Sequence, residues 1–425
     1  MKSFALRGHI CHTPEAGRLE VHEGAYVVCR DGKCGGIYDA LPENCAHMEV
    51  IDCGDRLIIP GMVDLHIHAG QYALRGTGMD YELLDWLDRV AFPEEARFVD
   101  GAYAERAYGI FAERLKRSAT TRAVIFATLH AGATLTLMDQ MEATGLVSYV
   151  GKISMDRNAP PELMEASALA AARDTRRFIE ESRRRGYSRT MPILTPRFVP
   201  SCTDALMASL GELQREYKLP VQSHLSENPG EVEWVKQLCP EAAFYGDAYD
   251  RFGLFGRDCN TVMAHCVYST PEEVARIKAN GVWVAHCPSS NMNLASGIAP
   301  VRKYLDAGLR IGLGSDVCGG TAESMFRAVT DAIQMSKLYW RFVDSGAKPL
   351  TFPEALYLAT KGGGTFFGKA GSFEAGYAFD ALVLDDSAEP CPRPLPVRSR
   401  LERAFYLGLD EKGIAMKYVD GERIV

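Results

Sequence analysis

The chain has 425 residues, enough for a large hydrophobic core and for one or two domains. Apolar residues make up 47% of it and charged residues 24%, which is typical of a soluble globular protein. The 47 basic and 55 acidic residues give a net charge of −8, so we expect neither nucleic acid nor a membrane surface as a partner. Residues 1–17 have no apolar signal-peptide core, and no apolar run reaches about 18 residues. We therefore expect a cytoplasmic protein without a transmembrane helix.

Twelve cysteines are scattered along the chain, and no C-x-x-C motif occurs. In a chain of this size, such a distribution predicts reduced, mostly buried thiols. Five of them lie within the first 53 residues. Their spacing is poor for a structural zinc site, so we do not assign one there.

Both ends of the chain have the composition of short β-strands. Asp31-Gly32 follows an apolar segment and predicts a hairpin turn. Near the other end, residues 379–384 read as a strand, and Asp420-Gly421 as a second hairpin turn. We therefore expect residues 1–59 and 370–425 to form one composite β-sandwich domain.

The middle of the chain alternates between strand-like and helix-like segments. Residues 102–115 and 162–185 have apolar residues near helical spacing, and Thr270 and Thr351 each open a capping box with proline at the first helical position. Eight such units predict an α/β fold, a (β/α)8 TIM-like barrel over residues 60–369, with its site at the carboxyl ends of the strands. The strand candidates are residues 57–68, 134–139, 147–154, 193–197, 221–224, 262–265, 282–286 and 311–316.

The connection between the first two predicted strands, residues 68–134, is unusually long. Most connections in compact domains have a median length of about 4–6 residues. We expect this long connection to cover the site.

Two histidines end the first predicted strand. Side chains alternate between the two faces of a strand, so His66 and His68 point the same way and Asp64 joins them. On a helix the same spacing would separate the two rings widely. Two imidazoles on one face at a strand end form half of a divalent metal site.

Further polar residues stand where the other predicted strands end, and a barrel brings these ends to one rim. Each has another interpretation on its own. Arg197 could be a structural ion-pair partner, Asp316 a helix N-cap, Glu227 a solvated charge, and His286 a hydrogen-bonding group below the rim. Together they favour one coherent site. The set is Arg197 after strand four, His224 and then Glu227 after strand five, His265 after strand six, His286 after strand seven and Asp316 after strand eight.

Five short stretches contain these candidate residues: 60–68 (PGMVDLHIH), 223–227 (SHLSE), 264–265 (AH), 286–288 (HCP) and 314–316 (GSD). In combination, they resemble the amidohydrolase superfamily, over nearly the whole chain. A second set lies in residues 68–72 (HAGQY), 83–87 (LLDWL), 92–93 (FP), 196–198 (PRF), 222–228 (QSHLSEN) and 316–320 (DVCGG). This set resembles the guanine deaminase family within that superfamily. Gly70, Ser315 and Cys318 depart from that family's usual pattern, which leaves the candidate ligands untouched and affects only the fit of the substrate.

The resemblance implies one zinc ion per chain, although Fe²⁺ would fit the same donors. Many members of the superfamily hold two metals through a modified lysine at the end of strand four. Strand four here ends in Thr195-Pro196-Arg197 without a lysine, which favours one ion, and Lys152 on strand three is a weak argument for a second ion. The implied ligands are His66, His68, His224 and Asp316.

The resemblance also implies hydrolytic deamination of guanine to xanthine and ammonia, by a homodimer. Asp316 would take the proton of the attacking water, and Glu227 would protonate N3 and then the leaving amine. His265 would stabilise the oxygen of the tetrahedral intermediate. The implied substrate-binding residues are Arg197, which would donate to O6, Gln71, which would read another ring edge, Phe198, which would pack on the ring, and His224 and Glu227.

Two other functions remain open from the sequence. The first is a related aminohydrolase that acts on another purine, a pterin or a triazine, and Arg197 with Gln71 would discriminate among these substrates. The second is a metal-binding protein without catalysis. Glu227 and Asp316 argue against the second, because a non-catalytic zinc site needs no additional acid.

Overall fold

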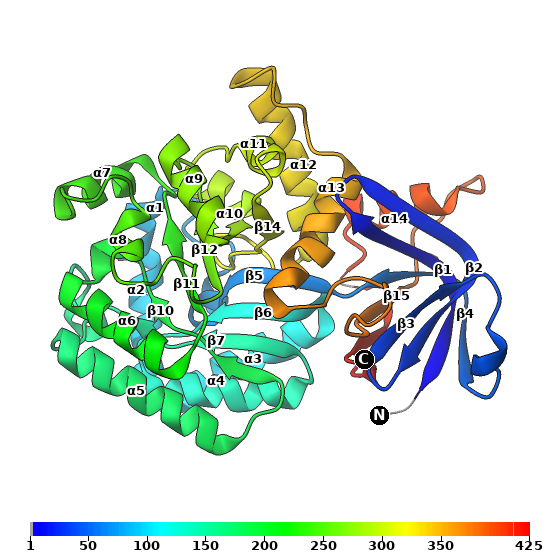
Figure 1. Cartoon of the computed structure of the whole chain (residues 1–425), viewed down its shortest axis with the longest axis horizontal. Helices are drawn as coiled ribbons and strands as arrows, with labels where there is room; N and C mark the ends of the chain where they lie inside the picture. The colour runs from blue at the N-terminus through cyan, green and yellow to red at the C-terminus, as the bar shows by residue number, and fades with distance from the viewer. Residues whose placement is uncertain (1–2, 411) are drawn as a thin grey trace.

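The computed structural model describes residues 3–410 and 412–425. It has two parts that lie side by side, an α/β barrel and a β-sheet built from both ends of the chain (Figure 1). Among the described residues, no helix is both long enough and apolar enough to cross a membrane.

Among the described residues, one seven-stranded sheet joins strands from the two ends of the chain. Strand β15 runs antiparallel to β4, with Ala381 opposite Pro60 and Leu384 opposite Leu57. Both Asp-Gly turns have left-handed backbone at their two central residues, which suits a tight hairpin. The strand order is β17-β16-β15-β4-β1-β2-β3. The strands are β1 (Phe4–Glu15), β2 (Arg18–Arg30), β3 (Lys33–Tyr38), β4 (Glu49–Pro60), β15 (Ala381–Leu384), β16 (Ile414–Val419) and β17 (Glu422–Arg423).

The barrel strands pair in parallel around a ring. The last strand meets the first where the Asp316 amide donates to the carbonyl of His66 at 2.8 Å. Below the rim, apolar side chains such as Val63, Val124 and Trp283 fill the interior and support the strand ends. The strands are β5 (Met62–His68), β6 (Thr120–Phe126), β7 (Val147–Gly151) with β8 (Ile153–Ser154), β9 (Thr190–Pro192) with β10 (Thr195–Pro196), β11 (Val221–Leu225), β12 (Thr261–His265), β13 (Trp283–His286) and β14 (Arg310–Leu313).

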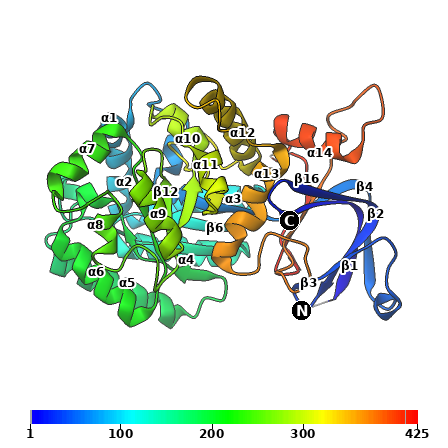
Figure 2. The same cartoon turned by 45° about the horizontal axis from the view of Figure 1, so that its top comes forward.

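Helices surround the barrel strands, and Figure 2 shows several of them on its outer side. The predicted helix over residues 102–115 is confirmed as α3. The helices are α1 (Leu83–Trp86), α2 (Phe92–Glu95), α3 (Gly101–Arg117), α4 (Ala131–Thr144), α5 (Ala168–Arg185), α6 (Asp204–Tyr217), α7 (Pro229–Leu238), α8 (Asp247–Asp250), α9 (Pro271–Asn280), α10 (Pro288–Asn293), α11 (Val301–Asp306), α12 (Met325–Phe342), α13 (Phe352–Tyr357) and α14 (Val397–Tyr406).

The prediction of a strand at residues 134–139 is wrong, because this segment lies inside α4 and the second barrel strand is β6. The two threonines that suggested a strand are accommodated in the helix. Their hydroxyls donate back along the helix, from Thr134 to the carbonyl of His130 at 3.0 Å and from Thr136 to that of Gly132 at 3.3 Å. Gly145, with a φ of 80°, then ends the helix.

Two helix starts differ from the sequence prediction. Helix α5 begins at Ala168 rather than near residue 162, because a short 3₁₀ turn precedes it and Ser167 is its N-cap. Thr351 forms the predicted capping box with Glu354. Thr270 caps α9, but the Glu273 carboxylate accepts hydrogen bonds from Ser226 and Gly246 instead of closing a box.

The long connection after β5 lies over the barrel rim, as predicted. It carries α1, a π-helical turn (Leu87–Ala91), α2 and α3 before the chain enters β6. Leu83, Trp86 and Leu87 from this connection line a cavity at the rim. The connection therefore supplies an apolar cover for the residues at the strand ends.

Candidate active site

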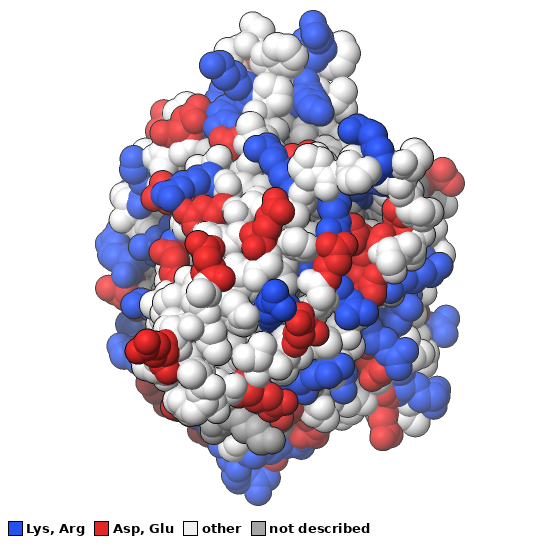
Figure 3. Space-filling view, turned by 90° about the vertical axis from the view of Figure 1, so that its right-hand side faces the viewer, with Lys and Arg blue, Asp and Glu red and all other residues white. Residues whose placement is uncertain are grey.

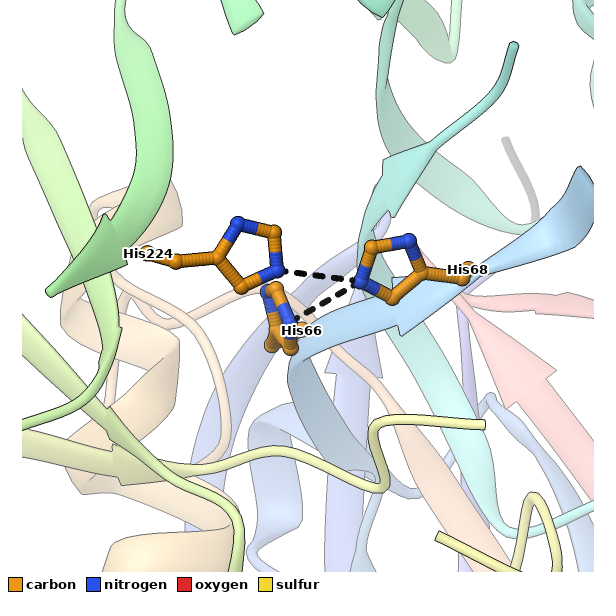
Figure 4. Close-up of side chains that lie close together, drawn as sticks. All are labelled: His66, His68 and His224. Carbon is orange, nitrogen blue, oxygen red and sulfur yellow. Dashed lines mark hydrogen bonds between the residues drawn. The ribbon is translucent and has the colours of Figure 1, made fainter. Parts of the chain in front are cut away.

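Three imidazoles converge above the barrel. His66 and His68 point to the same side at the end of β5, and His224 reaches toward them from β11 (Figure 4). The Nε2 atom of His68 lies 3.2 Å from Nε2 of His66 and 3.3 Å from Nε2 of His224. One ligand atom from each ring lies within 4.8 Å of those of the other two, which is close enough to share one metal ion.

Asp316 completes this group from the segment after β14. Its Oδ1 atom lies 3.1 Å from Nε2 of His66 and 3.4 Å from Nε2 of His68. Burial alone would raise the pKa of Asp316, but the His66 imidazole, through its charge and a hydrogen bond, and then His265 hold the pKa well below its ordinary value. The carboxylate therefore stays ionised and available as a ligand or as a base.

The donor set fits a zinc ion. Loss of hydration lowers the pKa of both His68 and His224 far below its ordinary value, which favours the neutral rings that can ligate. Nδ1 of His224 donates to the carbonyl of Arg197 at 2.6 Å, so its Nε2 presents a lone pair to the cluster. Neutral imidazoles with one carboxylate are ligands that zinc prefers.

Beside the cluster, His265 and Glu227 face each other. Nε2 of His265 lies 3.3 Å from Oε2 of Glu227 and 3.7 Å from Oδ2 of Asp316. On the other side of the ring, Nδ1 lies 3.0 Å from Oδ1 of Asn291. The ring thus has one nitrogen directed at the two carboxylates, and Asn291 helps to orient it.

Glu227 has the environment of a proton donor. It is buried, and burial together with the charges of Glu231 and Asp316 raises its pKa well above the ordinary value. The Ser296 hydroxyl donates to its Oε1 at 3.2 Å and opposes this shift. Its backbone amide donates to Glu231 at 2.9 Å, which fixes the turn that carries the side chain.

The cluster opens into a small cavity that is roofed by apolar side chains from the long connection. The lining residues are His68, Gln71, Leu83, Trp86, Leu87, Arg197, Phe198, His224, Glu227, His265, Leu294, Asp316 and Gly319.

On the far side of this cavity, one carboxylate holds two polar side chains. Arg197 donates to Glu95 through Nη1 at 2.5 Å and through Nη2 at 3.0 Å. The amide nitrogen of Gln71 donates to the same carboxylate at 2.8 Å. All three residues are buried, so Glu95 holds the guanidinium and the amide in place and compensates the buried positive charge.

This arrangement agrees with the match of the sequence to the amidohydrolase family, which extends over residues 57–424. The chain belongs to the amidohydrolase family. It is therefore a hydrolase, and the resemblance stated from the sequence motifs is confirmed. The barrel described above is also the fold of the similar guanine deaminase and triazine hydrolase structures.

Within the family, the chain is similar to guanine deaminases. It is 38% identical to the guanine deaminase of Dictyostelium discoideum, over 88% of this chain and 84% of that protein, and 38% identical to that of Homo sapiens, over 86% and 82%. A crystal structure of guanine deaminase from C. acetobutylicum, with guanine bound in the active site, matches with 44% identity and a TM-score of 0.96 over 100% of both chains. A triazine hydrolase matches at 18% identity with a TM-score of 0.84, which shows the shared fold alone.

Three residues that the sequence placed near this amidohydrolase site lie outside the ligand cluster. Asp64 accepts hydrogen bonds from the Ser315 hydroxyl and from the His66 amide, so it ties β5 to the end of β14, and burial raises its pKa to about 6. His286 is buried, and burial followed by the proximity of His265 lowers its pKa to about 3. Lys152 donates to Glu165 at 2.6 Å, away from the cluster.

The sequence did not single out Glu95, Glu231 or Asn291, which support the site from behind. Glu95 lies two residues after Pro93, but nothing in its own sequence context marks it as a partner of Arg197. The early cysteines belong to none of the three candidate metal groups found at the described residues. The supporting residues emerge only when segments distant in sequence meet in the fold.

Proposed function

We propose that this amidohydrolase deaminates guanine to xanthine and ammonia by hydrolysis. The observation that carries the proposal is one cavity with a metal-ligating cluster and an acid on one side and the Arg197–Glu95–Gln71 group on the other. Guanine offers an amine-bearing carbon to the first side and the O6 acceptor to the second. The similarity to guanine deaminases supports the same substrate.

We propose that His66, His68, His224 and Asp316 hold one zinc ion per chain. When bound, zinc would supply a Lewis acid that lowers the pKa of a coordinated water to about 7. Two observations support a single ion. Lys152 already donates a hydrogen bond to Glu165, and strand four ends without a lysine.

Three side chains would move or stabilise charge during the reaction. Asp316 accepts the proton of the attacking water, for which its depressed pKa leaves it ionised. Glu227, protonated through its raised pKa, donates to N3 as the water attacks C2. It then takes the remaining hydroxyl proton of the tetrahedral intermediate and passes it to the leaving amine, and the proton held by Asp316 restores the protonated Glu227. His265, 3.3 Å from Glu227 and 3.7 Å from Asp316, donates to the oxygen that develops negative charge.

Recognition would come from donors that are already oriented. The guanidinium of Arg197 has five N–H groups. Glu95 accepts two of them, so others remain to donate to O6. The side chains of Phe198 and Trp86 would pack against the flat ring system, with Gln71 at another edge and His224 and Glu227 at the reacting edge.

A substrate panel tests this function. Ammonia release is measured with guanine, 2,6-diaminopurine, adenine, a pterin and a triazine, on protein of known zinc content. We expect guanine to have the largest kcat/KM, and 2,6-diaminopurine, which lacks O6, to be rejected by about 10⁴-fold. Faster turnover of the pterin or the triazine would refute guanine as the substrate.

We further propose a cytoplasmic homodimer that acts in purine catabolism. The end of α12 exposes Leu338, Phe342 and Val343, with Phe342 78% exposed, which suits a contact with a second copy of the chain. The cysteines of the described residues are all free, which suits a reducing compartment. The mass in solution of the wild type and of Phe342→Glu tests the dimer: a wild-type monomer, or an unaffected variant dimer, would contradict this interface.

A further inference from the structure

A second group of metal-ligating side chains lies outside the active site, on the β1–β2 hairpin. It consists of His12, Glu20 and His22. In the register of the hairpin, His12 stands opposite Glu20 and Ile10 stands opposite His22. Because side chains two residues apart on a strand share a face, all three ligands project from the same face of the hairpin.

The spacing of these side chains suits one small cation. Oε2 of Glu20 lies 3.0 Å from Nε2 of His12 and 3.7 Å from Nε2 of His22. One ligand atom from each residue lies within 4.8 Å of the others. Two donors on a tetrahedral zinc ion lie about 3.4 Å apart, since each is about 2.1 Å from the metal. The three side chains therefore lie near the distances needed to coordinate one zinc ion, without any movement of the backbone.

An unsatisfied polar atom provides a second, independent observation. The Nε2 atom of His22 is buried, has no hydrogen-bond partner and lies 3.7 Å from the Glu20 carboxylate. The Nε2 atom of His12, which is only 4% exposed, forms a hydrogen bond with the same carboxylate oxygen at 3.0 Å. Buried polar atoms in proteins nearly always have a partner, so the free Nε2 of His22 beside a carboxylate is a candidate metal ligand.

The surroundings orient the carboxylate and leave the group accessible. Nη2 of Arg18 donates to Oε1 of Glu20 across 2.5 Å, so the other oxygen is directed at the two histidines. The side chains of Glu20 and His22 are 27% and 31% exposed, which gives an ion a route from solvent. Oδ1 of Asp39 lies 3.8 Å from Nδ1 of His22 and can orient that ring from outside.

We propose that His12, Glu20 and His22 form a second metal site, which takes a divalent transition-metal ion such as Zn²⁺. Two imidazoles and one carboxylate favour such an ion over Mg²⁺ or Ca²⁺, which prefer oxygen ligands alone. Figure 3 shows acidic and basic side chains mixed over the face that carries the composite sheet. Selectivity therefore comes from the three ligands rather than from a general negative field.

The site has a structural role that is separate from catalysis. All three ligands belong to β1 and β2, and the tip of this hairpin reaches α13, where Gly17 lies against Glu354. A bound ion would hold the two strands together at the end that contacts the barrel. We therefore expect it to raise the thermal stability of the folded chain and to leave guanine turnover unchanged.

Zinc titration of matched variants tests the proposal. Wild type and His22→Ala are prepared in a Cys391→Ser background, because Cys391 is exposed and could bind zinc itself. After dialysis against metal-free buffer, the residual zinc is counted and ZnCl₂ is titrated by calorimetry, with the melting temperature recorded at each addition. We expect the wild type to take up one equivalent beyond the zinc needed for full turnover, with a rise in melting temperature. His22→Ala should lose both effects and keep its turnover.

Two further variants keep the test decisive if His22→Ala changes the hairpin. Glu20→Gln preserves the size of the side chain and should weaken the additional site by at least about tenfold, since even outer partners of metal ligands contribute 10- to 100-fold. His9→Ala alters a histidine of β1 that pairs with Asp55 instead, and should bind like the wild type. A wild type that takes up no additional equivalent, or a Glu20→Gln variant that binds as tightly as the wild type, would overturn the proposal.

Discussion

The two sides of the active-site cavity are held in place in different ways. On the metal side, the side chains extend from barrel strand ends and are oriented largely by the backbone, as when His224 donates to the carbonyl of Arg197. On the recognition side, Arg197 and Gln71 are both held by Glu95, a side chain of α2 in the long connection. The chemistry therefore depends on the barrel itself, and the selection of substrate depends on one carboxylate from its cover. Changes on the two sides should have separable effects.

Removal of the metal should have the largest effect, because it removes the chemistry and leaves the recognition side intact. We expect a chelator to abolish turnover, and one equivalent of Zn²⁺ per chain to restore it. Zinc content and ammonia release, measured on the same samples, check this. If full activity required two equivalents, the single-ion active site would be wrong.

Glu227→Gln tests the proton transfer on the metal side. The two side chains are nearly isosteric, but an amide cannot exchange protons at neutral pH. General acid–base steps contribute about 10²–10⁴-fold, and the two roles of Glu227 place the expected loss in kcat near the upper limit. Zinc content and guanine affinity should not change.

Steady-state kinetics with zinc analysis check this prediction, and Glu233→Gln, an exposed residue of α7, is the control. A loss below about tenfold in a variant with full zinc would mean that another group carries the proton, since acid–base catalysis is worth more than that.

Arg197→Ala removes the proposed hydrogen-bond donor to O6 and should leave zinc bound. Loss of a hydrogen bond to a charged donor costs about 1.5–3 kcal/mol, which corresponds to roughly 10- to 100-fold in kcat/KM for guanine. The melting temperature should also fall, because Glu95 would remain buried without its partner. Kinetics and thermal unfolding check both effects, with Arg176→Ala, an exposed ion-pair residue, as control. Turnover of guanine at wild-type efficiency would exclude Arg197 as a substrate contact.

Glu95→Gln should have a smaller effect of the same kind. The amide keeps a hydrogen-bond acceptor for Arg197 and Gln71 but loses the charge that holds the guanidinium. We expect KM for guanine to rise by about tenfold, with kcat nearly unchanged, since this residue orients the donors without touching the reacting atoms. Glu94→Gln, its neighbour, should leave KM unchanged. A fall in kcat at constant KM would instead place Glu95 on the chemical side.

Glu231→Gln should produce the smallest effect, a shift in pH dependence. Burial, Glu231 and Asp316 raise the pKa of Glu227, so Glu227 is a proton donor below that pKa and kcat falls as the pH rises through it. Removal of the charge on Glu231 lowers the pKa of Glu227, so the basic limb of the kcat profile should move to lower pH by on the order of one unit. Glu233→Gln should leave the limb in place. A shift to higher pH would contradict the assigned role of Glu231.

The parts of the fold that were predicted correctly depend on local rules. The alternation of side chains along β5 is enough to put His66 and His68 on one face, and Asp-Gly is enough to specify both hairpin turns of the composite sheet. The segment 134–139 was misread because Thr-Leu alternation suits a strand and a helix equally well over so few residues. Tertiary packing decided that this segment is a helix. Strand β6 is already the barrel strand that pairs with β5, and α4 packs outside the barrel.

By itself, the sequence determined the barrel and the common face of His66 and His68, because strand periodicity and residue type are local properties. Its motifs determined the family and, through that resemblance, the residues that carry the proposed chemistry. Only the tertiary structure decided which groups support them. Glu95 meets Arg197 across 102 residues, and β15 meets β4 from the opposite end of the chain. The same holds for His12, Glu20 and His22, whose common face depends on the register of the hairpin. Such contacts follow from the closure of the fold, which places distant segments at hydrogen-bonding distance and leaves no periodic signal in the sequence.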